Sequence, residues 1–402
     1  MSQKIIIAGL GFAGLWASIA AARAVSLAGK DDEVEVINIS PSPNLAIRPR
    51  LYEPDLTPMN PDCGEVLDAA GVRHIAGFVE TIDTRGRSVT ITRADGSRET
   101  LAYDRFVLAA GSQSFRPPVP GLADFGFETD QLDTAQALAD HLTALAGRPE
   151  TEARNTVVVA GGGLTGLETV TEMPGRLRAA LGPDAAIRVI VVDGATVIGE
   201  AMGAEALPHI TEALAFAGVE SRAGVRVASI EPDAVTLSSG ERIATSTVVW
   251  TAGMRAHALA AQVPGEHDPL GRVIGDAWLH APAAAGVFVT GDTVKVPTDD
   301  QGNFNVMSCQ HAMSLGRVAG YNAAAELVGL PLHPYSQPKY VTCLDLGPWG
   351  AIYTEGWDRK LLYTRDDAKK IKREINTIWI YPPAPDRDAM FALANPDYVV
   401  VP

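Results

Sequence analysis

Cysteine is scarce in this 402-residue chain, and its spacing excludes two kinds of site. The three cysteines, Cys63, Cys309 and Cys343, form neither a CxxC pair nor the spacing of zinc ligands. The eight histidines form no HExxH or HxH arrangement. We therefore predict no disulfide framework and no metal site, and we interpret the cysteines as small apolar residues.

Positive charge and long apolar runs are also in short supply. The chain has 33 Lys and Arg residues against 48 Asp and Glu, a formal net charge of −15, which argues against a nucleic-acid partner because phosphate is bound by basic surfaces. The longest apolar run, residues 15–29, is interrupted by Arg23 and is shorter than a membrane span. No basic segment with a cleavage site precedes the first predicted strand, so we expect a cytoplasmic protein.

Apolar runs that break into glycine-rich turns predict two doubly wound α/β units. Each unit contains GxGxxG between a strand and a helix. Its first glycine permits a tight turn, its second lets a pyrophosphate approach the backbone, and its third lets helix and strand pack closely. The predicted strand, helix and strand are residues 4–8, 14–28 and 34–39 in the first unit and 156–160, 165–181 and 187–193 in the second. The glycines are Gly9, Gly11 and Gly14, and Gly161, Gly163 and Gly166.

The residue that ends the second strand of such a unit hydrogen-bonds a ribose hydroxyl. Asp193 has this place in the second unit, and its carboxylate favours NADH because it repels the extra phosphate of NADPH. In the first unit we assign the place to Asn38, which can form a hydrogen bond but carries no charge.

Two dinucleotide sites in one chain indicate a flavoenzyme that a nicotinamide reduces, and three further segments support this. They are "YDRFVLAAGS" (103–112) with Gly111, "STVVWTAGMR" (246–255) with Gly253, and "GVFVTGDT" (286–293) with Gly291 and Asp292. In this order they resemble the FAD- and NAD-binding fingerprints of the two-dinucleotide-binding-domain flavoproteins. The resemblance implies that Asp292 hydrogen-bonds the ribityl chain of FAD.

The same resemblance implies a domain organisation. Residues 1–112 and 256–330 would form a Rossmann-like FAD-binding domain, and residues 113–255 an inserted Rossmann-like NADH-binding domain. Residues 331–402 would form an interface domain with antiparallel strands. Disulfide reductases of this superfamily carry a CxxxxC pair where this chain has "NLAIRPRLYE" (44–53), so we do not expect dithiol chemistry.

Within the superfamily the chain resembles the type II NADH dehydrogenases. "IRPRLYE" (47–53) is similar to that family's "QPLLYQ" beside the flavin, which implies a cofactor contact for Arg48. "GGGLTGLE" (161–168) is similar to "GGGPTGVE", which implies that Glu168 lies near the stacked nicotinamide and flavin. "SCQHAMSLGR" (308–317) is similar to the quinone-side "AQxAxQQG" and keeps Gln310, but Ser314 and Leu315 replace the paired glutamines.

The resemblance implies that NADH reduces FAD and that a quinone-type acceptor takes the electrons. Beside Gln310, His311 could supply a proton, since an imidazole titrates near neutral pH. A histidine that is hydrogen-bonded on its helix without that role is the alternative. Two other functions stay open: an NADH-dependent reductase of an iron–sulfur protein or a soluble small molecule, and a redox sensor that binds flavin and NADH with negligible turnover.

The C-terminal segment gives two further expectations. Apolar alternation on both sides of residues 347–350 predicts an antiparallel hairpin. Residues 367–383 place Ile371 and Ile375 at helical spacing among basic residues. Such a helix could lie peripherally on the inner face of the cell membrane, as in the type II dehydrogenases, or pack on its own protein or on a second subunit of a homodimer.

Overall fold

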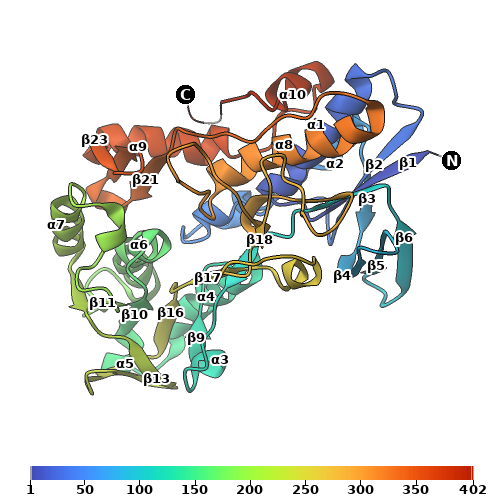
Figure 1. Cartoon of the computed structure of the whole chain (residues 1–402). Coiled ribbons are helices and arrows are strands. Elements are labelled where there is room, and N and C mark those ends of the chain that lie inside the picture. The colour runs from blue at the N-terminus through green and yellow to red at the C-terminus, as the bar shows by residue number, and fades with distance from the viewer. Residues whose placement is uncertain (1, 400, 402) are drawn as a thin grey trace.

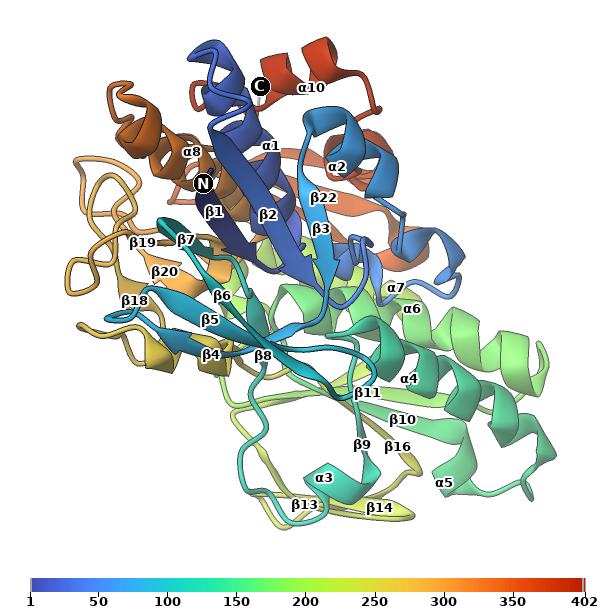
Figure 2. The same ribbon diagram turned by 90° about the vertical axis from the view of Figure 1, so that its right-hand side faces the viewer.

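The computed structural model describes residues 2–399 and 401. Its first sheet is wholly parallel, with the strand order β19-β7-β1-β2-β3 (Figures 1 and 2). Residues 5–7 are fully buried at its centre, as expected for a parallel sheet covered by helices. The strands are β1 (Gln3–Ala8), β2 (Val34–Ser40), β3 (Arg73–Ala76), β7 (Arg105–Leu108) and β19 (Val287–Val289).

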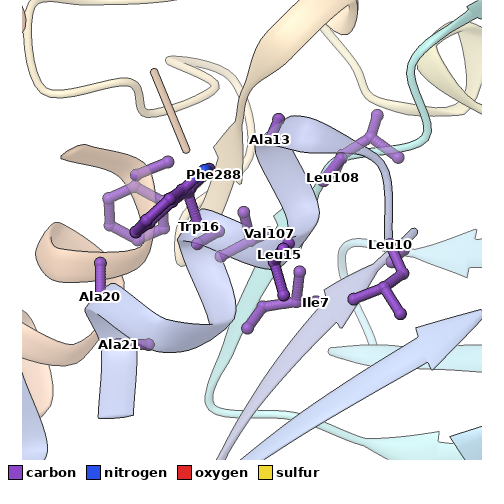
Figure 3. Packing of buried hydrophobic residues seen from close by; sticks show 14 of the residues in the cluster. Ile7, Leu10, Ala13, Leu15, Trp16, Ala20, Ala21, Val107, Leu108 and Phe288 are labelled. Atoms are coloured by element: carbon purple, nitrogen blue, oxygen red, sulfur yellow. The ribbon is translucent and has the colours of Figure 1, made fainter. Parts of the chain in front are cut away.

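Two long helices, α1 (Phe12–Leu27) and α8 (Cys309–Val328), pack against each other beside this sheet. The contact is close because α8 presents glycine to the α1 backbone. A Cβ on Gly316 would lie 2.3 Å from the Ala13 carbonyl oxygen, and one on Gly320 would lie 2.0 Å from that of Ala17. Figure 3 shows part of the core around α1, including Ile7, Leu15, Trp16, Val107 and Phe288.

The second sheet repeats the first, with five parallel strands in the order β12-β11-β10-β16-β9. Its strands are β9 (Gly126–Phe127), β10 (Thr156–Ala160), β11 (Arg188–Asp193), β12 (Val219–Ala223) and β16 (Thr247–Trp250). Its main helices are α4 (Leu132–Ala144), α6 (Leu164–Leu181) and α7 (Leu207–Ala217). Both predicted strand–helix–strand units are therefore present, and the predicted α/β fold with two Rossmann-like sheets is confirmed.

Short elements complete the two units and the passage between them. Three-stranded antiparallel sheets are formed by β4 (Phe78–Asp83), β5 (Ser88–Thr92) and β6 (Arg98–Ala102), and by β13 (Val227–Glu231), β14 (Ala234–Leu237) and β15 (Arg242–Ala244). Strands β8 (Ser112–Ser114) and β17 (Met254–Ala256) pair antiparallel where the chain leaves and re-enters the first unit. Other short α-helices and strands are α2 (Gly64–Ala70), α3 (Leu122–Phe125), α5 (Glu152–Asn155), β18 (Val273–Ile274) and β20 (Val294–Lys295).

The predicted C-terminal hairpin is confirmed as part of a three-stranded antiparallel sheet. Strands β21 (Val341–Asp345) and β22 (Ala351–Glu355) flank a 3-10 turn at Gly347–Trp349, and β23 (Lys360–Thr364) follows. Gly350 has φ +121°, and a Cβ there would lie 2.6 Å from the Arg365 Cα, so this turn requires glycine. Helices α9 (Arg365–Glu374) and α10 (Arg387–Leu393) come next, with a π-helical turn at Ile375–Trp379 after α9.

The amphipathic helix α9 packs on its own protein. Ala368 and Lys372 are buried, and Ile371 contacts the cluster that contains Val341 and Tyr353. Figure 1 shows α9 and β21 beside α6 of the second unit. The structure therefore shows the expected packing of this helix on its own protein, while the membrane and the second subunit stay predictions. No helix in the described part of the chain is long and apolar enough to cross a membrane.

Candidate functional site

The two glycine loops are open where a dinucleotide phosphate would have to approach. Helices α1 and α6 begin directly after Gly11 and Gly163, which have no side chain that could cap them. A Cβ built on either glycine would meet no described atom within 4 Å. The exposed N–H groups of a helix N-terminus bind phosphate well. Both loops therefore fit the pyrophosphate of a dinucleotide.

The outer glycines of the two motifs have a packing role. A Cβ on Gly14 would lie 2.0 Å from the Gly9 carbonyl oxygen, and one on Gly166 would lie 1.8 Å from that of Gly161. Gly9 and Gly161 themselves have φ +109° and +124°. Each helix can therefore start this close to its strand only because these positions are glycine.

Asp193 ends β11 and is bonded into the second loop. Its carboxylate accepts hydrogen bonds from the backbone N–H groups of Gly162 and of Ala195, the latter at 2.7 Å. These bonds fix the carboxylate next to the open glycine loop.

The assignment of Asn38 as the counterpart of Asp193 is wrong. Gly161 N–H donates to Val192 O, and Gly9 N–H donates to Ile39 O, so the residue equivalent to Asp193 is Ser40. Asn38 is fully buried, and its amide donates to Gly9 O at 2.9 Å. Asn38 therefore stabilises the glycine loop through its backbone, whereas Ser40 lines a cavity beside that loop. The signal for Ser40 was its place as the last residue of the apolar run "VEVINIS".

A cavity of about 520 Å³ extends along the first glycine loop, and we call it the loop cavity. Its wall includes the loop, the end of β2 with the turn after it, and the start of β8. The main lining residues are Gly9, Gly11, Phe12, Ser40, Ser42, Asn44, Arg48, Gly111, Ser112, Gly291, Asp292 and Ala312. Its volume is in the range of small-molecule sites.

A second cavity of about 300 Å³, the central cavity, lies between the first unit, α6 and the C-terminal segment. Its wall is mostly apolar, but it includes the polar side chains of Glu168, Gln310 and Lys372. Gly253 also lines it. Four residues line both cavities: Phe12, Arg48, Asp292 and Ala312. A molecule held in the loop cavity could thus reach the central cavity across a common wall.

Arg48 lies in a short 3-10 helix (Arg48–Arg50) at this common wall. Its Nε donates to the Asp130 carbonyl oxygen at 3.0 Å, its Nη2 pairs with the Asp130 carboxylate, and its Nη1 donates to Ser112 Oγ at 3.2 Å. Ser112 Oγ in turn donates to Asp292 Oδ2 at 2.6 Å. Burial raises the pKa of Asp292, and Arg48 and Ser112 oppose this shift. Sequence reasoning missed Asp130.

The three glycines that follow strands near this wall differ in what they contact. Gly291 has φ +65°, and a Cβ there would lie 2.7 Å from the Ala13 Cβ. Gly111 and Gly253 have φ +71° and +88°, and an added Cβ would have ordinary contact distances of 3.9 Å to Arg48 and 3.6 Å to Phe115. Backbone conformation accounts for glycine at all three positions.

Glu168 forms a buried ion pair that the sequence did not indicate. Lys372 Nζ of α9 lies 2.7 Å from Glu168 Oε1, and both side chains are only 8% exposed. Lys372 also donates to Cys343 O at 3.1 Å, and Asp345 N–H donates to Glu168 Oε1 at 3.1 Å. Burial raises the pKa of Glu168, and the Lys372 ammonium opposes it. The C-terminal segment thus supplies a charge to the central cavity.

Gln310 and His311 are neighbours on α8 but lie in different surroundings. Gln310 lines the central cavity, and its amide nitrogen donates to Val341 O at 2.8 Å. His311 is fully buried beside Tyr340 and Trp357, and its Nδ1 is 3.0 Å from Ser308 Oγ. Burial lowers the pKa of His311 to about 4. This geometry favours the structural alternative for His311 over proton supply.

The cysteines have two kinds of environment. Cys63 is fully buried, whereas Cys309 and Cys343 both line the central cavity. Burial raises the pKa of the thiols to about 12, 11 and 12 respectively, so all three are protonated at neutral pH. Among the residues described, no group of His, Cys, Asp and Glu could hold a metal ion.

Comparisons with known proteins agree with this geometry. Residues 3–316 match the pyridine nucleotide-disulphide oxidoreductase family. The chain is 46% identical over 383 residues to an NADH dehydrogenase-like protein of Mycobacterium tuberculosis (strain CDC 1551 / Oshkosh), with 94% of each chain covered. It is 27% identical to the demethylphylloquinone reductase NdbB of Synechocystis, covering 87% of this chain and 86% of that one. NDH2 from Plasmodium falciparum, solved with NADH, has the same fold with a TM-score of 0.79 at 11% identity, and 98% and 97% of the two chains are covered.

Proposed function

The chain belongs to the pyridine nucleotide-disulphide oxidoreductase family, and we propose that it oxidises NADH through a bound FAD and passes the electrons to a quinone-type acceptor. It is an NADH dehydrogenase-like flavoprotein oxidoreductase. The observation that supports the proposal best is the wall of four residues that the loop cavity and the central cavity share. A flavin held along the first glycine loop would present its ring at this wall, within reach of the second loop.

For FAD we propose residues 1–112 and 256–330 as the binding domain. The open backbone at Gly11 would receive the pyrophosphate, and Ser40 would face the ribose. Asp292 and Arg48 would hold the part of the flavin that reaches the common wall. FAD supplies hydride acceptance and electron transfer, so the protein's contribution is binding, orientation and electrostatics.

For NADH we propose residues 113–255, with the pyrophosphate on the Gly163 loop and the ribose at Asp193. The carboxylate that ends β11 is the expected discriminator against NADPH. Glu168 lies one helical turn into α6, at the wall of the central cavity, where it would border the nicotinamide. Its ion pair with Lys372 opposes the rise of the Glu168 pKa that burial causes.

For the acceptor we propose the side of the central cavity that α8 and residues 331–402, the interface domain, enclose. Apolar side chains predominate there, which suits a flat, apolar ring such as a quinone. They include Met307, Met313, Val341, Ile375, Trp379 and Ile380. Gln310 is the polar residue of α8 on this wall, and its amide is aligned by the backbone of β21.

Anaerobic stopped-flow absorbance tests the proposal in two steps. The purified protein is mixed first with NADH and then with a short-chain quinone. We expect NADH to bleach the flavin absorbance and the quinone to restore it over repeated turnovers. Bleaching without recovery would reject the quinone and favour another acceptor. Recovery that is slow with every acceptor would favour the sensor, and a preparation that binds no FAD would reject the proposal as a whole.

Glu168→Gln separates the two half-reactions. If Glu168 borders the nicotinamide, as proposed, NADH should reduce the variant more slowly, whereas reoxidation by the quinone should change less. If both rates are unchanged, the assignment of Glu168 is wrong. The pair partner Lys372 is not a suitable control here, because its removal leaves a charge buried.

A further inference from the structure

Arg48 occupies a special position in the electrostatics of the site. It is one of the four residues that line both cavities, and it is the cationic one among them. Its side chain is 23% exposed, at the border of the two cavities.

Two segments of the chain hold the guanidinium in place. The Asp130 carbonyl oxygen accepts from Nε at 3.0 Å, and the Asp130 carboxylate pairs with Nη2. Ser112 Oγ accepts from Nη1 at 3.2 Å. These bonds use three of the five N–H donors of arginine, so the group is oriented and still has donors for a ligand.

Asp130 is itself fixed from the other side. Its Oδ2 accepts from Ser114 N–H at 2.9 Å and from the Gln131 side chain at 2.9 Å. The carboxylate is only 14% exposed, so its charge is poorly screened by water. Asp292 Oδ2 lies 4.0 Å from Arg48 Nη1. One guanidinium and two carboxylates thus form a compact cluster, in which Arg48 and Asp292 line both cavities and Asp130 lines the central cavity.

We infer that Arg48 raises the reduction potential of the bound flavin and that the Asp130 carboxylate moderates this effect. The inference rests on the proposed function, because it requires a flavin at the common wall. A reduced flavin carries more negative charge than an oxidised one, so a fixed cation beside it favours the reduced form. An adjacent carboxylate cancels part of that field. Asp130 would therefore act through Arg48, as a positioning and charge-balancing residue.

An anaerobic titration of the full-length, FAD-loaded protein against a reference dye measures the potential directly. For Arg48→Gln we expect the affinity ratio of reduced to oxidised FAD to fall at least tenfold, which shifts a two-electron potential by about 30 mV to more negative values. Asp130→Asn removes the countercharge but keeps the backbone carbonyl that binds Nε, so we expect a shift to more positive values. Arg48→Lys keeps the charge and should lie between the wild type and Arg48→Gln.

Arg50→Gln is the matched control. Arg50 belongs to the same 3-10 helix, but its guanidinium binds Glu53 and Tyr381 and lines neither cavity among the residues described. Its removal should leave the potential unchanged. Equal shifts for Arg48→Gln and Arg50→Gln, or shifts of the same sign for Arg48→Gln and Asp130→Asn, would overturn the inference.

The proposed function and this inference fail in different ways. If the wild type binds no FAD or is not reduced by NADH, the proposed function fails. If it is reduced normally and the potentials of the variants do not separate, only the role of Arg48 and Asp130 fails. If Arg48→Gln loses its FAD, the reduction potentials of Arg48→Lys and Asp130→Asn are compared with that of the wild type instead. A more negative potential for Asp130→Asn than for the wild type contradicts the inference.

Discussion

Lys372→Met is expected to destabilise the packing of the C-terminal segment on α6 by about 3–5 kcal/mol, the usual result of breaking a buried ion pair by removal of one partner. Both side chains of the pair are only 8% exposed, so the charge left on Glu168 is poorly solvated. The variant also leaves Cys343 O without the hydrogen bond from Lys372 at 3.1 Å. Methionine has a similar length and shape, so the change acts mainly through the charge.

The assay is urea unfolding followed by tryptophan fluorescence, since Trp349, Trp357 and Trp379 all belong to this segment. A chain with several domains need not unfold in one step, so the transition that these residues report is the one to compare. Lys370→Met is the control: the same substitution on the same helix, at a lysine that is 73% exposed. A surface change of this kind should stay within about 0.5 kcal/mol.

The loss of unfolding free energy in Lys372→Met should also depend on pH. Burial raises the pKa of Glu168 in the folded protein, and the variant removes the ammonium that opposes this shift. A carboxyl group with a raised folded pKa stabilises the fold fully below its unfolded pKa and loses this contribution as pH rises through the folded pKa. The loss of unfolding free energy should therefore be smaller at pH 5 than at pH 8. A Lys372→Met variant that is as stable as Lys370→Met at pH 8 would refute this reasoning.

Three further predictions concern the loops and the cavity. Gly163→Ala should weaken NADH binding about tenfold with little loss of stability, because the added methyl group would have no neighbouring atom and would point into the opening of the loop. Gly166→Ala should lower the free energy of unfolding by several kcal/mol, because its Cβ would lie 1.8 Å from a carbonyl oxygen. Calorimetric titration measures the first effect and thermal unfolding the second. Asp193→Asn should reduce the preference for NADH over NADPH roughly tenfold in kcat/KM, and an unchanged preference would contradict the ribose assignment. Alkylation of Cys309 by iodoacetamide, followed by peptide mass, should accelerate about tenfold per pH unit up to its pKa of about 11, and a plateau near pH 8.5 would contradict the effect of burial.

The glycine loops could be predicted from the sequence because everything that defines them is local. A strand, three glycines and a helix follow one another within a short segment, and each glycine has its own steric reason. The ribose partner of the first unit could not be placed as safely. It depends on the last residue of β2: the predicted strand ended at Ile39, one residue before the observed end at Ser40, and the residue assigned, Asn38, lies two residues before Ser40.

The charged partners of the site were outside the reach of local reasoning. Asp130 is 82 residues from Arg48, and Lys372 is 204 residues from Glu168. Only the folded topology brings such residues together. The sequence pattern of α9 likewise indicated that one side of the helix is apolar, but not what this side packs against. In the structure it packs against the chain's own antiparallel sheet. For His311 the sequence left two roles open, and burial beside aromatic rings favours one of them.

The pairing of β8 with β17 has a consequence for protein engineering. Ser112 faces Ala256 in that ladder, and His257 N–H donates to Gly111 O at 2.9 Å just beyond it. The two ends of the intervening stretch are therefore neighbours, at a distance that a tight turn can close. A stretch with adjoining ends can be excised, exchanged for that of a relative or used as the cut for a circular permutant, while the remaining chain keeps its path.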